Sequence, residues 1–358
     1  MLFKITPRQN GGVARRYYAE ERLTDNNNIE SWGNLDEAFG SEIVWNDAKY
    51  LFEGKDPVSG IPLTRRRKDR KSGWDMTFVA PKTVSILWGL SSDDLREKIT
   101  EAHEKSVKAG LKILSEHAIR VSSRLLRYNG KLVLEESSAE RPLHGGFLFN
   151  HGMSRWKDPH LHTHCFLFNM GFVPESMNWR SLSLDYRWSY VAKGIYLLNL
   201  AWELKRLGFK IKKVGKSFVV DGFSGLLKSF SSASEVFSMK EIKSSAAWKE
   251  IRKKKDLSKN FSRLRTYWYT KAIVSGFDPS ILVPSSDNPI PESVEDTEVL
   301  IATKAAKHLA HIWQHATWNN IGKTNVEEVS QSVNRVVQRL KDREKNREER
   351  FDKKELVS

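Results

Sequence analysis

Histidines at positions 151, 162 and 164 are the residues of this sequence best suited to chemistry. His162 and His164 are two residues apart, and His151 lies eleven residues before His162. In a strand, side chains two apart point to the same face, so this pair would lie together. With a third imidazole from a neighbouring strand, it could hold a divalent cation and leave positions open for a substrate oxygen. The alternative is polar alternation on a solvated strand face.

A tyrosine pair and a carboxylate could supply the rest of a reaction. Tyr17 and Tyr18 lie in a predicted helix near the N-terminus, and Asp75 lies in a segment, 74–79, whose alternation predicts a strand. A tyrosine can attack phosphorus and form a phosphotyrosine, which divides strand transfer into two reversible steps. A base must take the phenolic proton and a cation must draw charge from the phosphate. Asp75 could be that base or could orient a histidine; packing of the tyrosines and a cap or salt bridge at Asp75 are the alternatives.

The charge of the chain points to a polyanionic partner. Its 358 residues include 59 Lys and Arg against 44 Asp and Glu, a formal net charge of +15. Such a surplus favours nucleic acid, whose phosphates give salt-dependent affinity, over small-molecule substrates. A solvated basic surface is the alternative for any one of the basic clusters, which are Arg65–Lys68 with Arg70 and Lys71, Lys210 to Lys216, and Arg252–Lys255.

Cysteine content and hydropathy bear on location. Cys165 is the only cysteine, which excludes an intrachain disulfide and favours a reducing compartment. The N-terminus lacks the apolar run of a signal peptide, and no stretch approaches the length of a membrane span. We therefore expect a cytoplasmic protein with no membrane insertion.

The remaining pattern predicts alternating helices and strands, followed by a helical C-terminal part. Strands are expected at 2–6 (ended by Pro7), 74–79, 132–134 and 147–151, helices at 14–20, 93–128, 185–207 and within 234–276, and a hairpin at 209–220. Four prolines between 279 and 291 predict a linker. Beyond it, helices are expected at 295–318 and from the capping box at Thr324 to Leu340, before a charged tail that we expect to be exposed or disordered.

In order and context, these motifs resemble those of the MobF-class conjugative relaxases, the TrwC- and TraI-like enzymes of the HUH endonuclease superfamily. The resemblance spans roughly residues 1–278. It rests on Arg16-Tyr17-Tyr18, the run from Asp75 to Ser85 with its Ala-Pro-Lys, His151, and the run from Asp158 to His164; weaker similarities are Ala201–Phe209 and Arg252–Lys255.

The resemblance implies an α+β fold, a five-stranded antiparallel sheet flanked by helices with the metal site on one face. Residues 1–278 would form the relaxase domain, 279–294 a linker and 295–358 a helical extension.

The implied activity is nicking of one DNA strand at an origin of transfer through a 5′-phosphotyrosine, and later rejoining. In such enzymes a tyrosine is the nucleophile, an acidic residue activates it and orients a metal ligand, and three histidines bind the metal. The matching residues here are Tyr17 with Tyr18 as its alternative, Asp75, and His151, His162 and His164. DNA-binding candidates are Arg16, Lys82, Arg252, Lys253 and Lys254.

A divalent metal ion and DNA are the implied ligands. Three imidazoles favour Mn²⁺, Ni²⁺ or Zn²⁺, whereas a phosphate substrate and cellular abundance favour Mg²⁺ or Mn²⁺. The implied partners are origin-of-transfer DNA (a hairpin and the single strand around the nick), a separate helicase, accessory DNA-binding proteins and a type IV secretion coupling protein.

The sequence departs from the family pattern in three ways. Residues 23–29 contain no second tyrosine pair, so a second tyrosine step would depend on Tyr18. His160 and His162 form an overlapping His-x-His frame, and the spacing from His151 favours 162 and 164. No Gly-x-x-x-x-Gly-Lys-Ser/Thr motif is present, so we predict no ATP-driven motor and expect either an excised relaxase domain or a stand-alone relaxase that borrows a helicase.

Two other functions remain open. Rolling-circle initiators and transposases of the superfamily usually carry the tyrosine downstream of the histidines, whereas this pair lies near the N-terminus, which favours a relaxase. A DNA-binding autoregulator with a dormant site would carry the same residues.

Overall fold

The computed structural model describes residues 2–9, 11–25, 29–64, 71–121, 124–128, 131–135, 141–215, 217–232 and 261–282. The expected helices between 234 and 260, nearly all of the expected linker and the expected extension at 295–358 lie outside these residues.

A five-stranded antiparallel sheet forms the centre of the protein. Its strands are arranged in the order β1-β3-β8-β7-β2. They comprise β1 (Phe3–Arg8), β3 (Gly73–Val79), β8 (Pro159–Phe168), β7 (Gly145–Met153) and β2 (Glu30–Gly33). The fold class predicted from the sequence is therefore confirmed.

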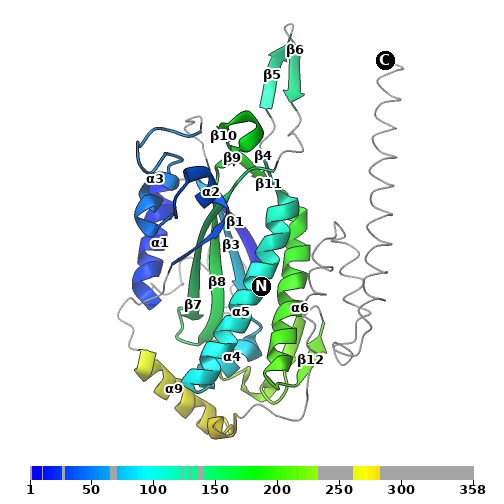
Figure 1. Ribbon diagram of the computed structural model, residues 1–358. Coiled ribbons are helices and arrows are strands. Elements are labelled where there is room, and N and C mark those ends of the chain that lie inside the picture. The colour runs from blue at the N-terminus through cyan, green and yellow to red at the C-terminus, as the bar shows by residue number, and fades with distance from the viewer. Residues whose placement is uncertain are drawn as a thin grey trace, which may run out of the picture.

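Helices cover both faces of the sheet. On one side lie the long helices α5 (Asp93–Ile113) and α6 (Ser189–Arg206), and on the other lie α1 (Gly11–Asp25) and the short α3 (Ala48–Leu51) (Figure 1). The helix α4 (Lys82–Leu90) follows β3 directly and packs against β8. The result is a three-layer arrangement with the sheet in the middle.

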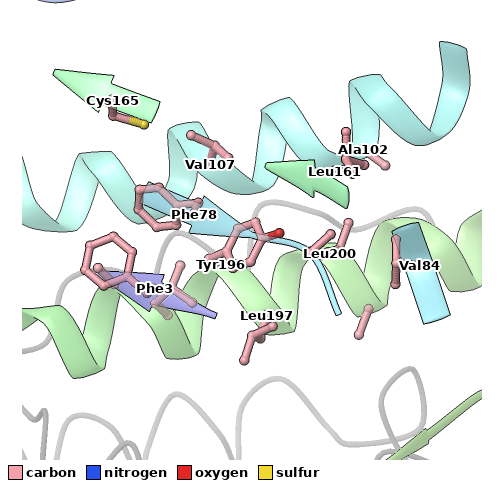
Figure 2. Packing of buried hydrophobic residues seen from close by; sticks show 14 of the residues in the cluster. Phe3, Phe78, Val84, Ala102, Val107, Leu161, Cys165, Tyr196, Leu197 and Leu200 are labelled. Atoms are coloured by element: carbon pink, nitrogen blue, oxygen red, sulfur yellow. The ribbon is translucent and has the colours of Figure 1, made fainter. Parts of the chain in front are cut away.

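Strand alternation divides the core into two parts. Trp74, Met76 and Phe78 of β3 belong to the larger cluster, which includes α5 and α6, and Figure 2 shows Phe78 packed near Val107 and Tyr196 of these helices. The opposite face of the sheet carries an aromatic cluster against α1, made of Tyr18, Phe52, Phe147, Phe149, Phe166 and Phe168 with smaller side chains. Asp75 and Thr77 alternate with the apolar residues of β3, so they share this second face.

The close approach of α5 to the sheet depends on Gly110. A Cβ atom at this position would lie 2.7 Å from a ring carbon of Phe78 and 3.1 Å from the backbone oxygen of Ala192. A larger residue would push the helix away from β3 or α6.

Two expected boundaries were wrong. The helix expected at 93–128 ends at Ile113 and continues as a π-helical turn, Leu114–Ala118, before β4 (Ile119–Val121). β4 pairs with β11 (Leu182–Leu184), which lies more than sixty residues later in the sequence. This long-range pairing overrides the local helical periodicity. The strand expected to end at Pro7 continues to Arg8, because β1 is an edge strand, where a missing N–H is tolerated.

The remaining elements largely agree with the expectations. The C-terminal part of the predicted helix at 185–207 is α6, the expected hairpin is β12 (Ile211–Val214) with β13 (Ser217–Val220), and α9 (Phe261–Val274) packs on α4. Shorter elements are α2 (Leu35–Phe39) and the pairs β5 (Arg124–Tyr128) with β6 (Lys131–Glu135) and β9 (Gly171–Val173) with β10 (Asn178–Arg180). None of the helices in the described part of the chain combines the length and apolar composition needed to cross a membrane.

Candidate active site

Strand register brings the three histidines together. His151 of β7 is directly opposite His162 of β8, and His164 lies two residues farther along the same face. The ring centroids are 5.1 Å apart for His151 and His162, 5.5 Å for His151 and His164, and 5.3 Å for His162 and His164. The three imidazoles therefore form a nearly equilateral triangle.

Hydrogen bonds fix the orientation of two of these rings. Nδ1 of His164 bonds Oδ1 of Asp75 at 2.8 Å, and Nδ1 of His162 bonds the backbone oxygen of His160 at 2.7 Å. With Nδ1 engaged in this way, Nε2 is the ring nitrogen that a metal ion would use. Burial, followed by the neighbouring His160 and His151, lowers the pKa of His162 well below its usual value, which keeps the ring in the neutral form that binds metals.

The donor set fits a divalent ion. Imidazole nitrogens coordinate zinc-like ions at about 2.1 Å, which places three rings at separations of roughly 5 Å around one ion. Across the described ranges, no three His, Cys, Asp or Glu side chains have the arrangement of a formed metal site.

His160 lies beside the triangle. Its ring centroid is 4.6 Å from that of His162, and burial together with the charge of Lys82 lowers its pKa to about 3. Its backbone oxygen holds the ring of His162, so it supports the frame formed by 162 and 164 through its main chain.

Asp75 is the buried carboxylate of this site. Its side chain is 2% exposed, Oδ1 accepts from His164, and Oδ2 forms an ion pair with Arg8. Thr77, which lies opposite His164, also donates to Oδ1 at 3.2 Å. Burial alone would raise the pKa of Asp75, but the charges and hydrogen bonds of His164 and Arg8 outweigh it and hold the pKa well below its usual value.

The two tyrosines of α1 differ in their environment. Their ring centroids lie almost equally far from that of His164, 6.2 Å for Tyr17 and 6.4 Å for Tyr18, but Tyr17 is only half-buried. Tyr18 is fully buried and stacks between Phe149 and Phe52, at 4.7 and 5.8 Å. Burial, and after it the charge of Asp75, raises the pKa of Tyr18 well above its usual value.

Arg8 belongs to the site and was not predicted from the sequence. Its guanidinium lies 4.7 Å from the ring centroid of Tyr17 and pairs with Asp75. Because the first strand was expected to end at Pro7, Arg8 was not expected to lie in the sheet beside Asp75. The only sequence signal was a basic residue at the end of a strand that precedes the tyrosine helix.

Of the five expected DNA-binding residues, the structure describes Arg16 and Lys82. Arg16 is exposed on α1. Lys82 donates to the backbone oxygen of Pro159 at 2.8 Å, and burial lowers its pKa to about 8, so its ammonium supports the start of the histidine strand. Arg252, Lys253 and Lys254 lie outside the described residues.

A buried polar chain supports the histidine strand from behind. Thr163, between the two histidines of β8, points to the α5 face, where His103 Nε2 lies 2.9 Å from its hydroxyl. Tyr196 of α6 continues the chain to Nδ1 of His103 at 3.0 Å, and Thr163 also donates to Asn150 of β7. Burial lowers the pKa of His103 to about 3, so the ring is neutral and can accept on one nitrogen while donating on the other. No sequence motif indicates this series of hydrogen bonds, because the residues that form it are far apart in the sequence.

The turn between β7 and β8 is anchored to C-terminal segments. Asp158 accepts two hydrogen bonds from Ser232, both 2.9 Å long, and Trp268 of α9 donates to the backbone oxygen of Lys157 at 2.6 Å. These bonds fix the entry into the strand that carries His162 and His164.

Sequence comparison identifies the family. The TrwC relaxase family model matches residues 6–273, which is more than half of the chain. The chain belongs to the TrwC relaxase family.

Relatives of known name agree with this assignment. The multifunctional conjugation protein TraI of Escherichia coli (strain K12) is 26% identical over 258 residues, which cover 63% of this chain and 13% of TraI. A second Escherichia coli TraI is 28% identical over 254 residues, with the same coverage of 63% and 13%. The chain thus spans only a small part of the length of these relatives.

Solved structures show the same fold. A metal-free structure of the conjugative relaxase TrwC in complex with oriT DNA superposes with a TM-score of 0.63 at 25% identity. The match covers 77% of this chain and 99% of the solved chain. A metal-bound structure of the same complex gives a TM-score of 0.64 at 24% identity with the same coverage of 77% and 99%.

Proposed function

We propose that this protein is a metal-dependent relaxase that nicks one DNA strand at an origin of transfer and later rejoins it. The observation that carries the proposal is the position of Tyr17, 6.2 Å from His164 in a triangle of three histidines. Membership of the TrwC family, whose solved members hold oriT DNA, supports the same activity.

In the proposed reaction the hydroxyl oxygen of Tyr17 attacks the scissile phosphorus. The new bond joins Tyr17 to the 5′ phosphate, and the bond from phosphorus to the 3′ oxygen breaks, which leaves a free 3′ hydroxyl after proton uptake. Attack by a 3′ hydroxyl on the phosphotyrosine reverses the step and reseals the strand.

Tyr17 is the better nucleophile candidate of the pair. It is half-buried, whereas Tyr18 has no exposed surface and is enclosed by Phe149 and Phe52. A phosphodiester could reach Tyr17 without rearrangement of the aromatic cluster. We therefore assign nucleophilic attack to Tyr17 and a packing role to Tyr18.

We assign Asp75 first to the orientation of His164. Both carboxylate oxygens are already bonded, and a carboxylate with a strongly lowered pKa is a weak base. If Asp75 takes the phenolic proton, its ion pair with Arg8 and its hydrogen bond with His164 would weaken in that step.

His151, His162 and His164 are the proposed metal ligands. A bound divalent ion would stabilise the negative charge that develops on the scissile phosphate. TrwC has been solved in a copper-bound and a metal-free form, and for this chain we propose Mg²⁺ or Mn²⁺ in cells.

Origin DNA, as a hairpin with the single strand around the nick, is the proposed substrate. The family match ends at residue 273, close to the boundary at 278 that we propose for the relaxase domain. We also propose a cytoplasmic location, and that a separate helicase, accessory DNA-binding proteins and a secretion coupling protein act with this protein.

A selection experiment tests the activity and identifies the nick sequence at the same time. The protein is incubated with Mn²⁺ and a single-stranded DNA library of random sequence labelled at its 3′ end, and SDS-stable adducts are isolated and sequenced. We expect adducts that share one cleavage sequence, since the 5′ phosphate of the 3′ fragment stays on the protein.

The tyrosine variants serve as controls. Tyr17→Phe should abolish the adduct while Tyr18→Phe retains it. Sequence-selective binding of the library without any adduct would contradict the proposal and support a DNA-binding regulator.

A further inference from the structure

We propose that Arg8 is a positioning residue that joins the carboxylate of Asp75 to the ring of Tyr17 and so holds the nucleophile beside the histidine triangle. The inference rests on the proposed function and adds a residue to it.

Strand register explains why Arg8 can reach both partners. In the β1–β3 pair, Thr6 is opposite Asp75 and Arg8 is opposite Gly73. Thr6 and Arg8 are two residues apart and therefore share a face of the sheet, the one that carries Asp75. The side chain of Arg8 extends along this face from the last residue of the edge strand.

Arg8 makes two different contacts with the site. One nitrogen of its guanidinium forms an ion pair with Oδ2 of Asp75, and the guanidinium carbon lies 4.7 Å from the ring centroid of Tyr17. The Arg8 side chain is 29% exposed, while Asp75 is 2% exposed. The ion pair is thus formed at the edge of the buried site, on the side of the half-buried tyrosine.

The carboxylate of Asp75 connects the two halves of the site. Its Oδ1 orients His164 at 2.8 Å, and its Oδ2 orients Arg8, which in turn packs on Tyr17. A displacement of the nucleophile by about 1 Å can cost on the order of 10²-fold in rate, so a contact that fixes the Tyr17 ring relative to His164 should affect the rate of attack.

The geometry suits a guanidinium better than an ammonium. Its planar group can donate to a carboxylate and lie over an aromatic face at the same time, whereas an ammonium acts as a point charge. A lysine at position 8 should therefore keep the ion pair and lose part of the contact with Tyr17.

Single-turnover cleavage of an oligonucleotide obtained from the library selection tests this role. At saturating DNA and Mn²⁺, we expect Arg8→Gln to slow adduct formation by about 10- to 100-fold, and Arg8→Lys to recover part of that loss. The affinity for the uncleaved oligonucleotide should stay within about twofold of that of the unmodified protein, because the contact is with the nucleophile. Arg15→Ala, which removes an exposed arginine of α1, is the matched control and should change neither quantity.

A double-mutant cycle separates this role from a general structural one. Because Arg8 acts together with Asp75, Arg8→Gln should slow adduct formation much less in the Asp75→Asn background than in the unmodified protein. Fully additive losses would overturn the proposal, as would a loss confined to DNA affinity with an unchanged rate at saturation.

A second measurement needs neither DNA nor activity. With 3-fluorotyrosine in place of Tyr17, the ¹⁹F resonance should shift in Arg8→Gln and stay in place in Arg15→Ala, in protein shown to be folded by its thermal melt. An unchanged resonance in Arg8→Gln would overturn the inference. Absence of adducts from the unmodified protein, together with the expected shift, would contradict the proposed function alone.

Discussion

At the scale of single residues, the site is organised around one buried carboxylate. Asp75 bonds a proposed metal ligand, His164, and an arginine that packs on the proposed nucleophile. The sequence predicted the tyrosines, Asp75 and the three histidines by motif, and the structure brings them together on one face of the sheet. The sequence alone could not predict the role of Arg8. Its ion pair with Asp75 joins residues that are 67 positions apart and depends on the register of an edge strand.

The hydrogen bond that His164 donates to Asp75 should affect metal affinity. Loss of a carboxylate that orients a metal-binding histidine usually lowers affinity by about 10- to 100-fold, and we expect this for Asp75→Asn with Mn²⁺ in isothermal titration calorimetry. His162→Ala and His164→Ala should lower the affinity for Mn²⁺ further, and His160→Ala should lower it only slightly. If His160→Ala lowered the affinity as much as His164→Ala does, the assignment of His162 and His164, and not His160, as metal ligands would be wrong.

Tyr18 should matter for stability more than for chemistry. Its ring is fully buried between Phe52 and Phe149, so Tyr18→Ala should lower the free energy of unfolding by about 3–5 kcal/mol, as truncation of a buried aromatic does. Tyr18→Phe keeps the ring and should retain most of the stability in urea denaturation. A severe loss in both variants would mean that the hydroxyl, and not ring packing, is the important group.

At the scale of elements, periodicity predicted the centres of most helices and strands but missed some of their ends. The helix from Asp93 stops at Ile113 because the following residues pair with a strand far away in the chain, and β1 passes through Pro7 because it is an edge strand. Both outcomes depend on tertiary pairing, which local patterns do not contain. The five-stranded antiparallel sheet was expected only through the family resemblance, and its strand order was not predicted.

Two helical glycines test the packing of the layers. Gly110→Ala in α5 would place a Cβ 2.7 Å from Phe78, and we expect it to lower the free energy of unfolding by about 1–3 kcal/mol through overpacking. A Cβ atom at Gly194 in α6 would have no other atom within 4 Å. Gly194→Ala should therefore raise the free energy of unfolding by about 1 kcal/mol through helix propensity. Equal effects of the two substitutions in thermal or urea unfolding would contradict the packing described for α5.

At the scale of the whole molecule, the excess of basic residues implies an electrostatic component of DNA binding. A chain with a formal net charge of +15 should release several counterions from single-stranded DNA. We expect affinity to fall by about 10- to 1000-fold between about 50 and about 200 mM salt, measured by fluorescence anisotropy with the selected oligonucleotide. Affinity that does not depend on salt would mean that the net charge is not used in binding.

The role of Tyr17 as the nucleophile can be tested by locating the DNA on the protein. The SDS-stable adduct is digested with protease and nuclease, and the peptides of α1 are sequenced by mass spectrometry. We predict a nucleotide joined through its 5′ phosphate to Tyr17. A nucleotide on Tyr18, or on a residue outside α1, would contradict this assignment.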